Sequence, residues 1–375
     1  MKLFHISDLH LGRRLNDYSL FEDQEHILRE ILNAADEERP DGVIIAGDIY
    51  DKAAPSEDAV RLFDDFLSGL AERGLKTFII SGNHDSAERV AFGGRIMDRA
   101  GIYISPAYDG ELRYVELEEN IRVYLMPFIR EIYVQSVFPD EEINSVTDAA
   151  RVVLKHTELD GSKINILAAH QFVTGKADGS DVERGEKQAR AVGGVDNINV
   201  NVFREFDYVA LGHIHKPQKV GRETVRYCGS PLKYSFDETK QRKEITVVEI
   251  RGKDDIKTRG IPLVPLRELR VIKGSFSELM SMDECGDYVK IILTEAGIPD
   301  ARLKLSKRFE KLADLEFSLF ETSSLSSAKG MKELGEKKPL DIIKEFFAVQ
   351  NGGEMSEEQS EICAAILNDI EKEGQ

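Results

Sequence analysis

The apolar positions of the chain gather in short runs that end abruptly in small or polar residues. The clearest run is Val43–Ala46, four apolar residues rich in β-branching, which Gly47 ends. Similar runs occur at Leu3–Ser7, Thr77–Ile80, Ile164–Ala168 and Phe206–Leu211. A strand that is buried on both faces of a parallel sheet gives a continuous hydrophobic run. We therefore expect these segments to be the central strands of an α/β fold.

Between these runs, apolar residues recur at helical spacing. The pattern predicts helices over Ser19–Glu38, Ser56–Leu70, Arg89–Ala100 and Asp148–His156. Ser56, with two acidic residues behind it, has the composition of a helix N-cap. Antiparallel strands are expected at Leu112–Leu117 and Ile121–Met126, and further strands at Thr224–Tyr227 and Glu244–Ile250.

The first domain is predicted to end near Pro262, because the pattern changes there to that of a smaller unit. A strand, helix, strand, helix, strand order is expected over Arg267–Ile272, Ser275–Met282, Tyr288–Leu293, Ala301–Phe309 and Ala313–Leu319. Ser323–Lys338 has no apolar period and is typical of a linker. Two amphipathic helices follow at Pro339–Gln350 and Ser356–Lys372. Their apolar stripes suggest a docking surface for a partner, with local packing as the alternative.

The residues that follow the strand runs carry metal-binding chemistry. Gly47 places Asp48 just beyond a predicted strand, at the edge where open α/β sheets bind ligands. A single aspartate of this kind is more often a turn or N-cap residue. The pattern is repeated, however. The other four runs lead to Asp8 and His10; to Asn83, His84 and Asp85; to His170; and to His213 and His215.

Five of the eight histidines occupy such positions, and the remaining three do not. Alternation in a strand puts residues i and i+2 on one face. Each of two pairs, Asp8 with His10 and His213 with His215, can therefore direct both side chains at one point. We therefore predict that these stretches converge on metal. Asp, Asn and His donors without Cys favour Mn²⁺, Mg²⁺ or Fe over a structural zinc.

Composition restricts the class of protein. A chain of 375 residues, 41% apolar, suits one large domain and one or two small ones. No run approaches the roughly 18 to 20 apolar residues of a membrane span, and the sequence starts with a strand, so a soluble cytoplasmic protein is expected. Its three widely spaced cysteines fit a reducing compartment. The net charge of −18 argues against a nucleic-acid partner, although Arg302, Lys304, Lys307, Arg308 and Lys311 form a basic cluster.

These motifs resemble a known superfamily. DLH, GDIYD, GNHD, a lone His after an apolar run, and GHIH occur in the order of the calcineurin-like metallophosphoesterase signature, over residues 1–261. Within it, the segments MKLFHISDLHLG, VGGVDNINVNVFREFDYVALGHIHKPQ and YCGSPLKYSFDE resemble the SbcD family of nucleases, and that resemblance covers almost the whole chain. It implies a sandwich of two mixed β-sheets flanked by helices, with a small α+β cap and a C-terminal helical tail.

The resemblance also implies a site. One divalent ion, Mn²⁺ first with Mg²⁺ or Fe as alternatives, would be held by Asp8, His10, Asp48 and His215. A second would be held by Asp48, Asn83, His170 and His213, so that Asp48 bridges the two. Such a pair clamps the attacking and leaving oxygens of a displacement at phosphorus. His84 would act on the scissile phosphate as the catalytic residue, by stabilising the transition state or protonating the leaving group.

The function implied is that of a DNA nuclease subunit. Its expected partner is an SbcC-like coiled-coil ABC ATPase, and its substrates are double-stranded, single-stranded and hairpin DNA in repair, recombination and replication. The implied domains are a nuclease domain (1–262), a DNA-facing cap (266–322), a linker (323–338) and a hairpin that binds SbcC (339–375). A homodimer through Ser56–Leu70 and Arg89–Ala100, within a nucleoid-associated heterotetramer, completes the prediction.

Two alternatives remain open at this point. A stand-alone phosphomonoesterase or cyclic-nucleotide phosphodiesterase would use the same metal centre but would not need residues 266–375. A non-catalytic scaffold on the same fold would typically have lost ligands, and this sequence keeps the full set.

Overall fold

The computed structural model describes residues 1–118, 120–176, 179–183, 197–295, 297–318, 339–351 and 354–373. The chain divides into two compact units: Met1–Arg270 with Gly286–Val289, and Val271–Cys285 with Lys290–Gln375. The predicted linker at 323–338 lies outside the described residues, and the predicted domain boundaries stay a prediction. Among the helices that the structure describes, none combines the length and apolar character that crossing a bilayer requires.

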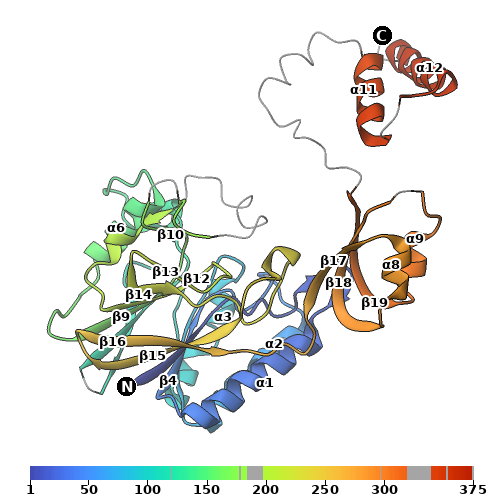
Figure 1. The fold of residues 1–375 in the computed structure, drawn as a ribbon. Helices are drawn as coiled ribbons and strands as arrows, with labels where there is room; N and C mark the ends of the chain where they lie inside the picture. The colour runs from blue at the N-terminus through green and yellow to red at the C-terminus, as the bar shows by residue number, and fades with distance from the viewer. Residues whose placement is uncertain are drawn as a thin grey trace. The chain divides into compact units, whose positions relative to one another are not determined.

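The first unit is built on two six-stranded sheets (Figure 1). One sheet contains β1 (Lys2–Ile6), β4 (Gly42–Ala46), β5 (Lys76–Ile80), β6 (Ile102–Ile104), β15 (Glu244–Gly252) and β16 (Asp255–Pro262), in the order β16-β15-β1-β4-β5-β6. The other contains β7 (Arg113–Leu117), β8 (Ile121–Met126), β9 (Ile164–His170), β12 (Tyr208–Gly212), β13 (Gln218–Val220) and β14 (Arg222–Tyr227), in the order β13-β14-β12-β9-β8-β7. In the first sheet β16, β15 and β1 pair antiparallel, whereas β1, β4, β5 and β6 pair parallel. In the second sheet the two edge pairs are antiparallel and the inner pairs are parallel, so both sheets are mixed.

An apolar layer between the sheets forms the centre of this unit. Ile44 and Ala46 of β4 belong to the same buried cluster as Ile166 and Ala168 of β9. The intervening residues of β4 are also fully buried, on the opposite face. Both faces of the strand are therefore covered, which is why its sequence shows no alternation. The predicted sandwich of two mixed sheets is confirmed.

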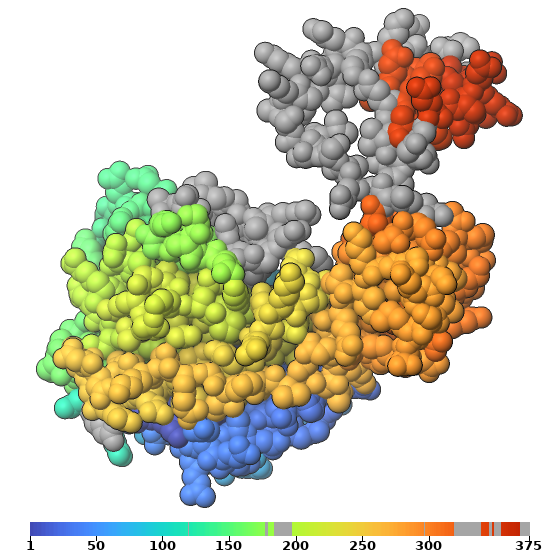
Figure 2. All heavy atoms as spheres, viewed as in Figure 1, coloured from blue at the N-terminus to red at the C-terminus, as the bar shows by residue number. Residues whose placement is uncertain are grey.

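Two long helices, α1 (Phe21–Glu38) and α2 (Glu57–Glu72), pack together beside the first sheet (Figure 1). The predicted cap of α2 is confirmed, because Ser56 Oγ accepts the N–H of Ala59 at 3.3 Å. Figure 2 shows the gold atoms of β15 and β16 beside the blue atoms of α1. Arg259 Nη2 donates to Glu38 Oε2 at 2.5 Å there, which joins segments more than two hundred residues apart.

The prediction of one helix over Arg89–Ala100 is wrong. The chain forms α3 (Ala87–Val90), α4 (Gly94–Met97) and a 3₁₀ turn, η1 (Asp98–Ala100). Gly93 separates α3 from α4 with a φ of 73°, which a right-handed helix cannot contain. The break leaves Phe92 and Ile96 83% and 77% exposed.

Shorter elements cover the second sheet and connect the strands. A buried cluster joins this sheet to α6 (Val146–Lys155) and α5 (Glu131–Val137). The others are β2 (Arg14–Leu15), β3 (Tyr18–Ser19), β10 (Val173–Thr174), β11 (Ile198–Asn199), η2 (Val200–Phe203) and η3 (Phe236–Glu238).

In the second unit, the described residues of 269–317 form a three-stranded sheet, β17-β18-β19, with two helices. Its elements are β17 (Leu269–Gly274), α8 (Phe276–Ser281), β18 (Cys285–Leu293), α9 (Ala301–Leu305) and β19 (Phe309–Phe317). A capping box of Ser275 and Glu278 starts α8. The predicted order of elements is confirmed, but Phe309 begins a strand instead of ending a helix. Farther along, α11 (Pro339–Asn351) and α12 (Glu357–Glu373) pack against each other.

Candidate metal centre

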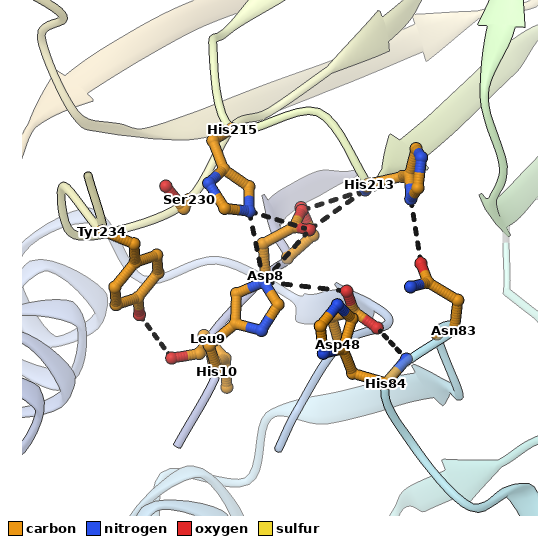
Figure 3. A network of polar contacts seen from close by, with 12 residues as sticks. Asp8, Leu9, His10, Asp48, Asn83, His84, His213, His215, Ser230 and Tyr234 are labelled. Atoms are coloured by element: carbon orange, nitrogen blue, oxygen red, sulfur yellow. Dashed lines mark hydrogen bonds and ion pairs between the residues drawn. The ribbon is translucent and has the colours of Figure 1, made fainter. Parts of the chain in front are cut away.

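The predicted ligands meet at one edge of the sandwich, and Figure 3 labels all of them except His170. The predicted ligands lie at or just beyond the C-terminal ends of β1, β4, β5, β9 and β12, strands that form the parallel pairs β1–β4, β4–β5 and β9–β12. Asp8 N–H donates to the Gly47 carbonyl at 3.0 Å, and the ring Nδ1 of His170 lies 2.7 Å from the Ala46 carbonyl. The first bond joins the ends of two strands of one sheet, and the second contact joins the two sheets.

The expectation that strand alternation pairs Asp8 with His10 and His213 with His215 is wrong in its geometry. β1 ends at Ile6 and β12 at Gly212, before the ligands begin. Asp8, His10, Asp48 and His213 instead have φ values of 54°, 44°, 50° and 95°. Side-chain-bearing residues rarely adopt this left-handed region, and such strain gathers at functional sites.

The first group of donors surrounds His10 and His215. Their Nε2 atoms lie 3.2 Å apart, and Asp8 Oδ1 lies 3.9 Å from each of them. The Nδ1 atom of His215 lies 2.9 Å from Glu238 Oε1, an arrangement that places the ring proton on Nδ1 and the lone pair on Nε2. A lone pair and a carboxylate oxygen directed at one point fit a divalent cation.

Asp48 lies between this group and the second one. Its Oδ2 is 3.7 Å from His10 Nε2 and 3.3 Å from His170 Nε2. Its Oδ1 accepts the backbone N–H of His84 at 2.9 Å. One carboxylate oxygen therefore faces imidazoles of both groups, which is the position of a bridging ligand.

The second group is centred on Asn83. Its Oδ1 lies 2.9 Å from His213 Nδ1 and 3.2 Å from His170 Nε2. The structure thus brings all seven predicted ligands together. Carboxylate, amide and imidazole groups supply every donor of this set, so it fits Mn²⁺, Mg²⁺ or Fe better than a thiolate-bound metal.

His84 lies beside the ligands. Its Nδ1 is 2.9 Å from the Asp51 carbonyl oxygen, which leaves Nε2 available for another group. A ring nitrogen of His84 also lies within 4.8 Å of donor atoms of His10 and Asp48. The predicted role on the phosphate therefore stays a prediction, with metal ligation as the competing role.

Comparisons with known proteins identify the family of this chain. Residues 1–217 match the family described as calcineurin-like phosphoesterase. Residues 265–351 match a family described as type 5 capsule protein repressor C-terminal domain. Two curated proteins, each named as the SbcD subunit of the SbcCD nuclease, come from Staphylococcus epidermidis and Staphylococcus saprophyticus and are 31% identical over 100% of both chains. The chain belongs to the calcineurin-like phosphoesterases, in the SbcD family. A solved dimetal phosphatase from Danio rerio, 13% identical, covers 70% of this chain and 96% of its own, with a TM-score of 0.41.

Behind the predicted ligands lie charged residues that the sequence analysis missed. Lys243 Nζ donates to Glu238 Oε2 at 2.6 Å, to the His215 carbonyl at 2.8 Å and to Ser230 Oγ at 2.9 Å. Burial opposes ionisation of Glu238, but its contacts with His215 and the Lys243 ammonium lower the pKa of its carboxyl to about 2. Glu238 therefore fixes the orientation and tautomer of His215. In the sequence, the only signal for Glu238 is its place in the SFDE segment.

Two aspartates nearby have structural contacts. Asp85 accepts backbone N–H groups of Ile49, Tyr50 and Gly82. Burial and the charge of Asp48 raise the pKa of its carboxyl to about 6. Asp51 accepts Arg13 Nη1 at 2.6 Å and supplies the carbonyl that holds His84.

Protons and cations compete for this site. Burial opposes ionisation of Asp48, yet the neighbouring His170 and His10 hold the pKa of its carboxyl well below the usual range. Burial lowers the pKa of His170, but Asp48 outweighs it and raises that pKa to about 9. A cation must displace the proton of His170, so affinity for metal is expected to rise with pH.

Glycines make room for the ligands. A Cβ at Gly47 would lie 2.4 Å from His170 Nδ1, and a Cβ at Gly82 would lie 2.1 Å from Asp48 Oδ1. Both distances are far below van der Waals contact, so no larger residue fits without displacing a ligand.

Proposed function

We propose that this protein is the nuclease subunit of an SbcCD-type complex and hydrolyses DNA phosphodiester bonds with two divalent cations. The preferred metal is Mn²⁺, with Mg²⁺ or Fe as alternatives. The observation that carries the proposal is the position of Asp48 Oδ2 between His10 Nε2 and His170 Nε2. A carboxylate shared by two imidazole-containing groups suits a two-ion site. The two full-length relatives named as nuclease subunits support the choice of DNA as substrate.

Each predicted ligand has a role in this proposal. Asp8, His10, Asp48 and His215 would hold one cation, and Asp48, Asn83, His170 and His213 would hold the other. Two bound cations supply Lewis-acid stabilisation for the attack of water on phosphorus. The backbone N–H of His84 holds Asp48 in place, and in the imidazolium form of His84 the available Nε2–H could donate to a phosphate oxygen or to the leaving group.

The proposal extends to partners and location. An SbcC-like ATPase would bind the helical pair α11 and α12. The domains that precede this pair along the chain would be a nuclease domain (1–262), a cap (266–322) and a linker (323–338). The substrates are double-stranded ends, single strands and hairpins, in cytoplasmic, nucleoid-associated repair and recombination. The active assembly contains two copies of this chain.

A stand-alone phosphomonoesterase or cyclic-nucleotide phosphodiesterase is not favoured. Neither would account for the second family match at residues 265–351 or for relatives aligned over their full length.

The test is cleavage of labelled linear and hairpin DNA in Mn²⁺, with and without the ATPase, by the wild-type chain and an Asp48→Ala variant. We expect the variant to lose cleavage by several orders of magnitude and to keep its fold, because Asp48 lies beyond a strand end. Glu223→Ala, which removes an exposed surface carboxylate, is the matched control. A folded Asp48→Ala protein with near wild-type cleavage would contradict the proposal.

A further inference from the structure

A groove of about 500 Å³ opens beside the metal centre in the first unit. Its walls come from the segment after β5, the loop after β6, the loop after β8, and α5. The residues that matter here are Asn83, Phe128, Arg130 and Tyr133. This volume lies in the range of sites that hold small organic groups.

Hydrogen bonds and ring contacts fix the walls of the groove relative to the predicted metal ligands. Asn83 lines it directly, and the Phe128 ring centroid lies 6.5 Å from that of His170. The N–H of Phe128 donates to the Ser81 carbonyl at 3.0 Å, and Gln171 Nε2 donates to the Ile129 carbonyl at 3.2 Å. The loop after β8 is therefore bonded to the two segments that carry Asn83 and His170.

The side chains of the groove combine a positive charge, on Arg130, with the aromatic rings of Phe128 and Tyr133. The Arg130 guanidinium lies 5.6 Å from the Phe128 ring centroid, and no carboxylate pairs with it among the residues that the structure describes. Tyr133, one turn along, is 55% exposed. The acidic residues of the groove have partners of their own: Asp85 accepts three backbone amides, and Glu88 accepts Ser86 Oγ at 3.0 Å.

We propose that this groove binds the unpaired nucleotide next to the scissile phosphate, with Tyr133 stacked on its base and Arg130 paired with its backbone phosphate. The inference rests on the proposed nuclease function. A π-face and a guanidinium are the groups that bind single strands without reading their sequence. Because a base inside a duplex is already stacked on its neighbours, only an unpaired nucleotide can occupy the groove.

The experiment compares two substrates of the full-length protein in Mn²⁺. One is a single-stranded oligonucleotide, and the other is bis(p-nitrophenyl) phosphate, which has a scissile diester but no neighbouring nucleotide. We expect Tyr133→Ala to lower kcat/KM for the oligonucleotide on the order of ten-fold and to leave hydrolysis of the small diester unchanged. Tyr133→Phe keeps the ring and should cleave both substrates as the wild type does.

Arg130→Gln supplies an independent readout. Removing one contact to a single-strand phosphate should reduce the slope of log KM against log salt concentration by about 0.7. Ile132→Ala is the matched control, because Ile132 is 71% exposed on the same helix and does not line the groove.

Several results would overturn the proposal. Unchanged oligonucleotide cleavage in Tyr133→Ala and an unchanged salt slope in Arg130→Gln would contradict the nucleotide site alone. Equal losses on both substrates would assign Tyr133 to the structure of the metal centre, and a lower molecular mass of Tyr133→Ala by light scattering would assign it to contacts between copies. A wild-type protein that hydrolyses the small diester but no DNA would overturn the nuclease function and the nucleotide site together.

Discussion

Single residues of the metal centre are held in conformations that their side chains disfavour. Asp8, His10, Asp48 and His213 are all left-handed, each at a cost of the order of 1 to 3 kcal/mol. Backbone bonds from Asp8 and His10 to the Gly47 and Asp48 carbonyls hold the first two in place. The strain is offset by the surrounding sheets, and it directs side chains from separate strands toward one point.

Glu238 provides a test of how His215 is positioned. We expect Glu238→Gln to weaken Mn²⁺ binding by about 10- to 100-fold, since a neutral amide holds the His215 ring less firmly and leaves Lys243 buried without its counter-charge. Calorimetric titration of the apoprotein with Mn²⁺ measures this directly. Glu223→Gln on the surface should bind as the wild type does, and equal affinity of the two variants would show that Glu238 does not position the ligand.

Substitution of His84 distinguishes a role on the phosphate from a role as a metal ligand. If His84 acts on the substrate as proposed, His84→Asn should lose about 10²-fold or more in cleavage rate while both cations remain bound. Metal content per chain and cleavage rate are measured on the same preparation, beside His156→Asn, which changes a surface histidine at the end of α6. A fall in metal content would assign His84 as a ligand instead.

Among the elements, the strands of the sandwich and the C-terminal helices differ in what surrounds them. β4 is buried on both faces, and its position is determined by the two sheets. By contrast, Ile362 and Ile366 of α12 are each 55% exposed on one helical face. Apolar side chains at i and i+4 that remain exposed are typical of a helix that binds a partner.

This exposed face of α12 leads to a prediction about the ATPase. Ile362→Asp with Ile366→Asp, or truncation after Glu336, should abolish co-purification with an SbcC-like protein, since each buried side chain contributes roughly 1.5 to 3 kcal/mol. Basal Mn²⁺-dependent cleavage of short DNA should persist, because the ligands lie in residues 8–215. Leu303→Asp, an exposed apolar residue of α9, is the control. A truncated protein that binds the ATPase with unchanged affinity would show that docking lies elsewhere.

The proposed assembly of two copies would use a surface that the broken helix creates. Phe92 and Ile96 are exposed beside the interruption at Gly93, and Val60 of α2 is 46% exposed. Large exposed apolar side chains of this kind mark association surfaces. They are the natural contacts for the proposed homodimer through α2 and the α3–α4 segment.

The corresponding prediction concerns molecular mass. By light scattering at micromolar concentration, the wild type should have about twice the 42.2 kDa of one chain, and Phe92→Asp with Ile96→Asp should have the mass of one. Leu303→Asp, also exposed, should remain a dimer. A wild-type protein of single-chain mass would contradict the dimer.

What the sequence determined by itself was the set of strands and the chemistry at their ends. A strand buried on both faces must be apolar throughout, so Val43–Ala46 was recognisable without its neighbours, and Asp or His beyond such a strand is conspicuous. The order of elements in the second unit followed from periodicity in the same way. Those signals are local, and each lies within a few consecutive residues.

The tertiary structure alone decided which atoms meet. Strand alternation gave the wrong geometry for Asp8 and His10, because left-handed turns set by bonds to the β4 loop orient them. Glu238 and Lys243 escaped prediction because their importance comes from contact with His215, more than twenty residues away. The φ of Gly93, which breaks a helical pattern, was equally invisible in the sequence. Contacts between distant segments leave no periodic trace in a single chain, and only the packed sheets bring them together.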